Sequence, residues 1–190
     1  NGGIYIGNAE NPYAILLKPA DSEANQLTTH NQTILIANNA FARNEKLTVV
    51  TTNEGLKIIG DNAFNSCKVL ETVILAGSLS DIRDNAFANC DKLATVTQNN
   101  APFEMSNINT GLNAFAGTPY FNAIAAANKG LVISGGILYG IDANILAKSF
   151  AKDSVTDYDV YLTLQDKAET KSTKLRVKGE EKKITVYVVT

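Results

Sequence analysis

The chain has 190 residues, a formal net charge of −2 and a hydrophobic fraction of 45%. A folded chain of this length buries roughly 70% of its extended surface, so it needs no metal or disulfide to hold a core. The small net charge gives no electrostatic reason to expect a nucleic-acid partner, and no apolar run approaches the ~20 residues of a membrane span.

The first part of the chain predicts two strands and a turn. Residues 4–6 and 13–18 are rich in strand-forming residues, and the polar stretch GNAENP at 7–12 separates them. We expect this hairpin to cap one open end of the domain. The chain begins without Met and without a basic-then-apolar leader, so either a signal segment has been removed or the chain is an excised part.

The middle of the chain is a tandem repeat. The tripeptide Asn-Ala-Phe ends at Phe41, Phe64, Phe87 and Phe115, which are 23, 23 and 28 residues apart. Aligned on these phenylalanines, further positions recur as well. They are Ile at −5 (Ile36, Ile59, Ile82), Cys at +3 (Cys67, Cys90), Leu at +6 (Leu47, Leu70, Leu93) and Val at +9 (Val50, Val73, Val96).

The spacing inside one unit predicts a short helix and a short strand. Apolar residues three apart after the Phe are typical of a helical turn, and the Asn before Ala-Phe is a residue type that caps such a turn. The β-branched segments 48–51, 72–75 and 95–97 predict strands. One unit cannot cover its own apolar side, so we expect the copies to stack into a solenoid.

The period and the pattern Ala-Phe-x-x-Cys-x-x-Leu-x-x-Val resemble the BspA-like (Treponema pallidum type) leucine-rich repeats of bacterial surface proteins. The resemblance covers residues 34–98 and extends into the fourth unit. The block AFAGTPYFNAIAAANKGLVISGGILYGID at 114–142 is also similar to the segment that follows such repeats. The chain departs from the family pattern at Asn44, which stands in place of Cys, and in the insertion TQNNAPFEMSNIN at 97–109.

The end of the repeat region predicts a helix over residues 119–127, because Pro is favoured at a first helical position. Lys129 and Gly130 end it, and Gly135-Gly136 predicts a tight hairpin turn. Alternating patterns around 159–166, 172–179 and 182–190 predict three strands of a small antiparallel sheet. The fold class is therefore an α+β leucine-rich repeat solenoid with β-hairpin flanks, over residues 1–141. A β-rich segment follows at 142–190, which either packs on the repeats or is part of an Ig-like module.

Residues with reactive side chains form no pattern that predicts an enzyme, a cofactor or a metal. Cys67 and Cys90 are equivalent residues of adjacent units that point the same way, so we expect two reduced core thiols and no disulfide. His30, the only histidine, lacks the partners of a metal site or triad, which predicts a solvated loop residue. The acidic pairs Asp81/Asp84 and Glu180/Glu181 fall in polar loops or turns, where nothing raises a pKa for acid–base chemistry.

The outward face of the repeat strands is the candidate binding surface. On each strand the third and fifth positions of Leu-x-x-Val-x-Leu are expected to face solvent. The residues concerned are Val49, Thr51, Thr72, Ile74, Thr95 and Thr97. This strip carries no charge. It suits a protein partner, although strand propensity alone also accounts for Thr and Val there.

The resemblance implies a secreted or cell-surface bacterial protein that adheres to host or bacterial surface proteins. The residues themselves imply only a repeat surface that mediates protein–protein interaction. Two alternatives stay open. One is a structural spacer or presentation module within a longer surface protein. The other is a carbohydrate-binding module, which exposed aromatic rings would favour; Tyr120, Tyr139, Tyr158, Tyr161 and Tyr187 lie outside the repeat strands.

Overall fold

The computed structural model describes residues 2–142, 160–163, 168–177 and 180–189. The chain divides into two compact units, Asn1–Phe121 and Asn122–Thr190. The first unit holds the repeats, which confirms the expected solenoid fold. The placement of the boundary after residue 141 stays a prediction.

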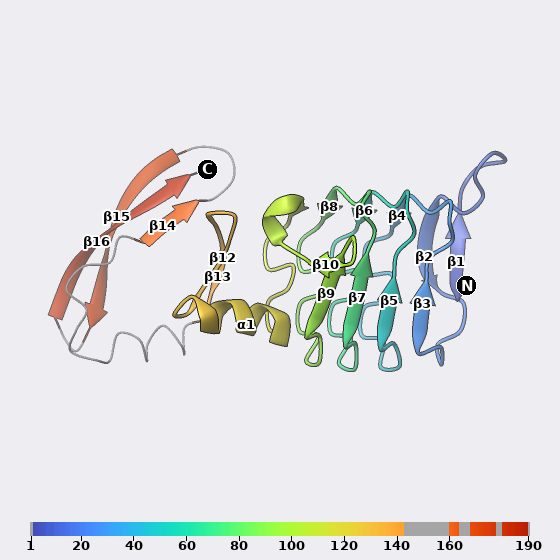
Figure 1. Ribbon diagram of the computed structural model, residues 1–190, viewed down its shortest axis with the longest axis horizontal. Coiled ribbons are helices and arrows are strands. Elements are labelled where there is room, and N and C mark those ends of the chain that lie inside the picture. The colour runs from blue at the N-terminus through green and yellow to red at the C-terminus, as the bar shows by residue number, and fades with distance from the viewer. Residues whose placement is uncertain (1, 143–159, 164–167, 178–179, 190) are drawn as a thin grey trace. The chain divides into compact units, whose positions relative to one another are not determined.

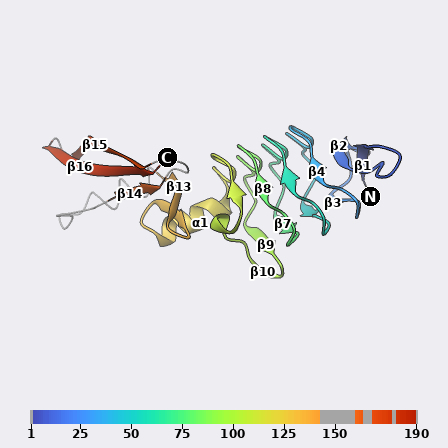
Figure 2. The same ribbon diagram turned by 90° about the horizontal axis from the view of Figure 1, so that it is seen from above.

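The first unit is a solenoid with two β-sheets, and each coil gives one strand to each sheet (Figures 1 and 2). The six-stranded sheet has the order β1 (Gly3–Ile6), β2 (Ile15–Pro19), β4 (Leu35–Ile36), β6 (Ile58–Ile59), β8 (Asp81–Ile82), β11 (Asn109–Thr110). The five-stranded sheet has the order β10 (Ala101–Pro102), β9 (Thr95–Gln98), β7 (Thr72–Leu75), β5 (Val49–Thr51), β3 (Gln26–Thr28). Coil-to-coil pairs are parallel and in register, as in Val50 with Val73 and Val73 with Val96.

The repeated phenylalanines form a buried ladder between the two sheets. Phe64 and Phe87 are completely buried, and their ring centroids lie 5.1 Å apart with an angle of 1° between the planes. The neighbouring pairs, Phe41–Phe64 and Phe87–Phe115, are each 5.2 Å apart. Stacked rings contribute about 0.5–1.5 kcal/mol per pair beyond the burial of their area.

The segment expected to form a short helix in each unit is instead a series of tight turns. In the second unit the N–H groups of Ala63, Asn65 and Cys67 donate three residues back within the same turn. The N–H groups that alternate with these belong to Asn62, Phe64 and Ser66, and they donate to carbonyls of the next coil at 2.7–2.9 Å. An α-helix directs its N–H groups to its own carbonyls four residues back, so this turn replaces a helix where the coils must bond each other.

The Asn of Asn-Ala-Phe occupies this turn because of its backbone angle. Asn39, Asn62, Asn85 and Asn113 have φ angles of 58°, 54°, 54° and 55°. This left-handed region is costly for most side chains but accessible to Asn. An N-cap residue has an extended backbone instead, so the capping role expected from the sequence is wrong. Two residues after each Phe a second left-handed position recurs, occupied by Arg43, Ser66, Asn89 and Gly117.

Both ends of the solenoid are closed by segments that depart from the repeat. At the start, β1 pairs antiparallel with β2, which confirms the predicted hairpin cap. At the other end the insertion forms a hairpin from β9 to β10, followed by the short 3-10 helix η1 (Met105–Asn107). Phe103 and Tyr120 from these segments contact the last ring of the ladder, Phe115, with centroids at 5.8 and 5.1 Å.

Helix α1 (Pro119–Ala127) has the predicted bounds. The hydroxyl of Thr118 accepts the N–H of Phe121 at 3.0 Å and so caps the first turn of this helix. Lys129 and Gly130 follow α1 with positive φ angles of 54° and 97°.

Beyond α1, the described residues of the second unit form two small sheets. The predicted hairpin of β12 (Leu131–Ser134) and β13 (Ile137–Ile141) turns through Gly135 and Gly136, whose φ angles are 55° and 82°. The other sheet contains β14 (Val160–Thr163), β15 (Ala168–Val177) and β16 (Glu180–Val189). The sequence predicts three antiparallel strands here, but β14 runs parallel to β16, so the sheet is mixed. Tyr158 lies outside the described residues.

Replacing Phe64 with Ala is expected to lower the free energy of unfolding by about 3–5 kcal/mol, because it leaves a cavity in the middle of the ladder. Chemical denaturation followed by circular dichroism measures this. Phe64→Leu keeps most of the volume and should cost less. An unchanged denaturation midpoint in Phe64→Ala would contradict the ladder.

Replacing Asn62 tests the backbone role of the repeated Asn. Asn62→Ala should cost about 1–2 kcal/mol, because Ala is strained at positive φ, whereas Asn62→Gly should cost less because Gly adopts that region freely. The two variants are compared by thermal and urea unfolding. If Ala proved at least as stable as Gly, the left-handed backbone would not be what selects Asn.

Candidate partner-binding face

The structure brings all six residues of the predicted surface together on the five-stranded sheet. They form two columns because their strands pair in register. Val49, Thr72 and Thr95 make one column, and Thr51, Ile74 and Thr97 make the other. The residue between the two columns on each strand, such as Val73, is buried and belongs to the core. Their role in binding stays a prediction.

Neighbouring strands extend this surface beyond the residues identified from the sequence. Gln26 and Thr28 of β3 pair with Val49 and Thr51, and both are exposed. At the other edge, Pro102 of β10 is exposed and pairs with Thr97. We call the outward residues of β3, β5, β7 and β9 together with Pro102 the five-strand face. Its members are Gln26, Thr28, Val49, Thr51, Thr72, Ile74, Thr95, Thr97 and Pro102.

The additional strand β3 has a signal in the sequence. Leu27-Thr28-Thr29 precedes Val50-Thr51-Thr52 by the same 23 residues that separate the first three phenylalanines. A search on Asn-Ala-Phe misses this coil because Lys18 stands where its Phe would be. Pro102 has no such signal, since it lies in the insertion.

The five-strand face is uncharged and only partly exposed. Ile74 is 38% exposed, Thr95 is exposed, and Val49, Thr51, Thr72 and Thr97 are half-buried. The threonine hydroxyls offer both donors and acceptors, whereas Val49 and Ile74 offer apolar contact. The arrangement suits recognition through neutral polar and apolar groups, and it brings no nucleophile or acid–base pair together.

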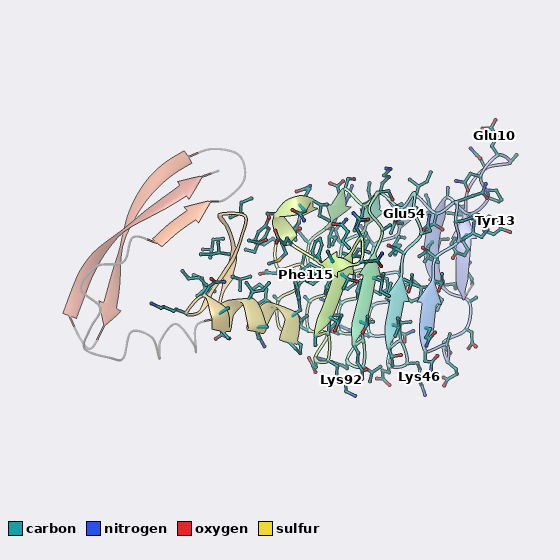
Figure 3. The ribbon with its side chains drawn as sticks, viewed as in Figure 1. Glu10, Tyr13, Lys46, Glu54, Lys92 and Phe115 are labelled. Carbon is teal, nitrogen blue, oxygen red and sulfur yellow. The ribbon has the colours of Figure 1, made fainter. Side chains whose placement is uncertain are left out.

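Charged side chains lie beyond the ends of the strands, where several are paired between coils. Lys46 contacts Glu23 at 3.0 Å and Lys68 contacts Asp91 at 2.9 Å. The hydrogen bond and charge of Glu23 raise the pKa of Lys46. At the opposite ends of the strands the carboxylate of Glu54 accepts the N–H groups of Gly77 and Ser78. Figure 3 shows Lys46 and Lys92 at one end of these strands and Glu54 at the other.

The two cysteines are free, buried core residues. Each thiol lies 3.1 Å from a Phe carbonyl of the preceding coil, Cys67 from Phe41 and Cys90 from Phe64, and donates to it. The neighbouring Cys67 thiol and burial raise the pKa of Cys90. Each S–H group therefore bridges adjacent coils.

His30 is a half-buried member of a ring cluster rather than a solvated loop residue. Its ring stacks on Tyr13 with centroids 3.7 Å apart, and its Nδ1 accepts the N–H of Gln32 at 3.2 Å. The hydroxyl of Tyr5 accepts the backbone N–H of His30. Tyr13 is 40% exposed. Tyr5 belongs to β1 and Tyr13 precedes β2, whereas His30 follows β3 by two residues.

The acidic residues considered for acid–base chemistry have structural partners. Asp81, which begins β8, accepts hydrogen bonds from Ser80 and Asn109, and these lower its pKa. Asp84 accepts the N–H of Leu112 from the next coil at 2.7 Å. A lowered pKa keeps the Asp81 carboxylate ionised at neutral pH, the opposite of what a general acid requires. Glu180 and Glu181, expected in a polar loop or turn, begin β16.

Two sheets whose coil-to-coil strand pairs are parallel, tight turns, a 23-residue period and a buried Phe in four successive coils define a leucine-rich repeat solenoid. The family model described as "BspA type Leucine rich repeat region (6 copies)" matches residues 20–140. The chain therefore belongs to the BspA-type leucine-rich repeat family, as the residue pattern predicted.

Three solved structures with similarity to the chain are of bacterial proteins. The Treponema pallidum leucine-rich repeat protein is 22% identical, with 58% of this chain and 51% of that chain covered and a TM-score of 0.49. The pneumococcal vaccine antigen PcpA is 25% identical over 56% of this chain and 25% of that chain, with a TM-score of 0.46.

A leucine-rich cell surface protein from Faecalibacterium prausnitzii is 17% identical over 74% of this chain and 57% of that chain, with a TM-score of 0.35. The chain thus spans about a quarter of PcpA and about half of the other two chains. No curated protein matches. Among the described residues, no helix has the length and apolar character needed to cross a membrane.

The native thiols are expected to react slowly with a disulfide reagent such as DTNB near pH 8, because both are buried and that of Cys90 has a raised pKa. Unfolding in guanidinium should expose both. Thr95→Cys, which places a thiol on an exposed position, provides the fast-reacting control. Rapid reaction of a wild-type thiol without denaturant would contradict the buried positions.

Proposed function

We propose that this chain is the protein-binding module of a secreted or cell-surface bacterial protein, and that it binds through the five-strand face. The observation that carries the proposal is the in-register pairing of β3, β5, β7 and β9. This pairing places two columns of neutral side chains on one continuous surface. Stacked repeats commonly use such extended surfaces to bind partners. Adhesion to host or bacterial surface proteins is the biological role we assign to it.

Stacking alone does not require the composition of this surface. Each sheet has an exposed charged residue directly before one of its strands, Lys57 before β6 and Glu71 before β7, but only the six-stranded sheet has a charge within a coil strand, the half-buried Asp81 of β8. The five-strand face carries none, although both sheets stack through the same backbone bonds. A spacer needs only the buried ladder, so the difference between the two sheets supports a binding role for the neutral one.

Two glutamates placed on the five-strand face test this function. Thr72→Glu with Ile74→Glu should abolish binding in a surface array of matrix proteins and mucins, because a partner would have to desolvate two unpaired charges. Both positions are outward, so the fold should persist, as a thermal melt would check. Lys57 directly precedes β6 of the six-stranded sheet. Lys57→Glu changes the net charge by the same two units and serves as the matched control.

The outcomes separate the candidate functions. Binding that survives the double substitution and fails in Lys57→Glu would place the contact on the other sheet. If deletion of the repeats from a longer surface protein left its binding intact, the spacer function would replace the one proposed.

A further inference from the structure

We infer that the occupant of the five-strand face is a single extended, uncharged polypeptide segment that lies across the strands. This inference rests on the proposed function and names the kind of partner the face takes. Three properties of the face carry it: its size, its lack of charge and the distribution of its hydroxyl groups.

The five-strand face is too small to hold a folded protein partner by itself. Five strands at a spacing of about 4.8 Å give a width of roughly 19 Å, and three residues at about 3.3 Å give a length of roughly 10 Å. The resulting area of about 200 Å², even doubled for side-chain relief, is well below the ~800 Å² per partner of a stable interface between folded proteins. A second copy of the same face cannot close this deficit.

The same dimensions fit one extended chain. About six residues at roughly 3.3 Å each span the ~19 Å across the strands. The two columns run across the strands, one from Gln26 to Thr95 and the other from Thr28 to Pro102. They are separated by about 6.6 Å, the length of two residues along a strand. A peptide lying along the columns contacts every coil, whereas one parallel to the strands contacts only one or two.

The chemistry of the face matches an unpaired backbone. An extended segment presents N–H and C=O groups that lose stability if they are buried without partners. Thr28, Thr51, Thr72, Thr95 and Thr97 carry hydroxyls that can donate to a carbonyl or accept from an N–H. Val49 and Ile74 lie among them and take apolar side chains of the segment.

The charges around the face also favour a neutral segment. Three lysines beyond the strand ends are matched with acidic residues of adjacent coils, as Lys46–Glu23, Lys68–Asp91 and Lys92–Glu71. The Glu54 carboxylate at the other strand ends is bonded to backbone N–H groups. These groups already have partners within the fold, so a charged segment would gain little from them and would have to give up its own hydration.

The test uses a phage-displayed library of short random peptides, selected on the whole chain and counter-selected on the Thr72→Glu/Ile74→Glu variant. We expect enrichment of uncharged peptides, and synthetic copies should bind the wild type and lose at least about tenfold in affinity on the variant. Thr95→Arg, on an exposed position of another strand, should weaken the same peptides. Lys57→Glu should leave them unaffected.

The inference is overturned if no peptide is enriched, if the enriched peptides are charged, or if they bind the double variant as well as the wild type. The last result would place them elsewhere, for example as an added strand at β1 or β3. Dextran tests the carbohydrate alternative: face-dependent binding of this neutral polysaccharide without any peptide also overturns the inference. If intact folded proteins bind in a face-dependent manner and peptides do not, the proposed function stands and only the extended-segment inference fails.

Discussion

The coil-to-coil backbone hydrogen bonds are the constraint on which the rest of this structure depends. The two sheets fix the separation of adjacent coils at about 4.8 Å, and the turns add a third set of bonds at 2.7–3.0 Å between coils. The phenylalanine rings, with centroids 5.1–5.2 Å apart, lie at nearly the same repeat. The rings therefore stack face to face because the backbone has already set their spacing, and a side chain of another shape in one coil would leave its neighbours unmatched.

The positions that depart from the repeat show how the bonding between coils ends at the two ends of the array. Cys67 and Cys90 each donate to the Phe carbonyl of the preceding coil, but the coil before Phe41 has no such Phe. Asn44 stands there instead, and its side-chain oxygen accepts the N–H groups of Lys46 and Leu47 in its own coil. At the other end Thr118 replaces Cys and caps α1. Each departure converts a bond between coils into a bond within one segment.

These rules explain which features could be predicted from the sequence. The period of 23, the buried phenylalanines and the strands at Val50, Val73 and Val96 follow directly from repeated residues. The turn could not be distinguished from a helix, because apolar residues three apart fit both structures. What separates them is the destination of alternate N–H groups, such as those of Asn62 and Phe64, which bond another coil. That information lies in tertiary structure rather than in local pattern.

The candidate surface was predictable to a similar extent. The alternation around each buried Val fixes which residues face outward, and the repeat period places them side by side. At the edges, β3 lacks the Asn-Ala-Phe signature and shows only in the 23-residue spacing of Leu27 and Val50, whereas Pro102 lies in the insertion and has no signal. The parallel pairing of β14 with β16 also has no local signal. Tyr13 and His30 are far apart in sequence, and only the fold of the cap stacks their rings.

The last edge of the five-stranded sheet bears on the choice between a spacer and a binding surface. After β9 the chain reverses through Asn99 and Asn100, whose φ angles of 52° and 59° suit a tight hairpin turn. It returns as β10, in which Pro102 has no N–H to offer a further strand. The six-stranded sheet continues through β11 to the next coil, whereas the five-stranded sheet is blocked at this point. A module that served only to lengthen an array would gain nothing from blocking one sheet, but a surface that must hold one short segment gains a defined end.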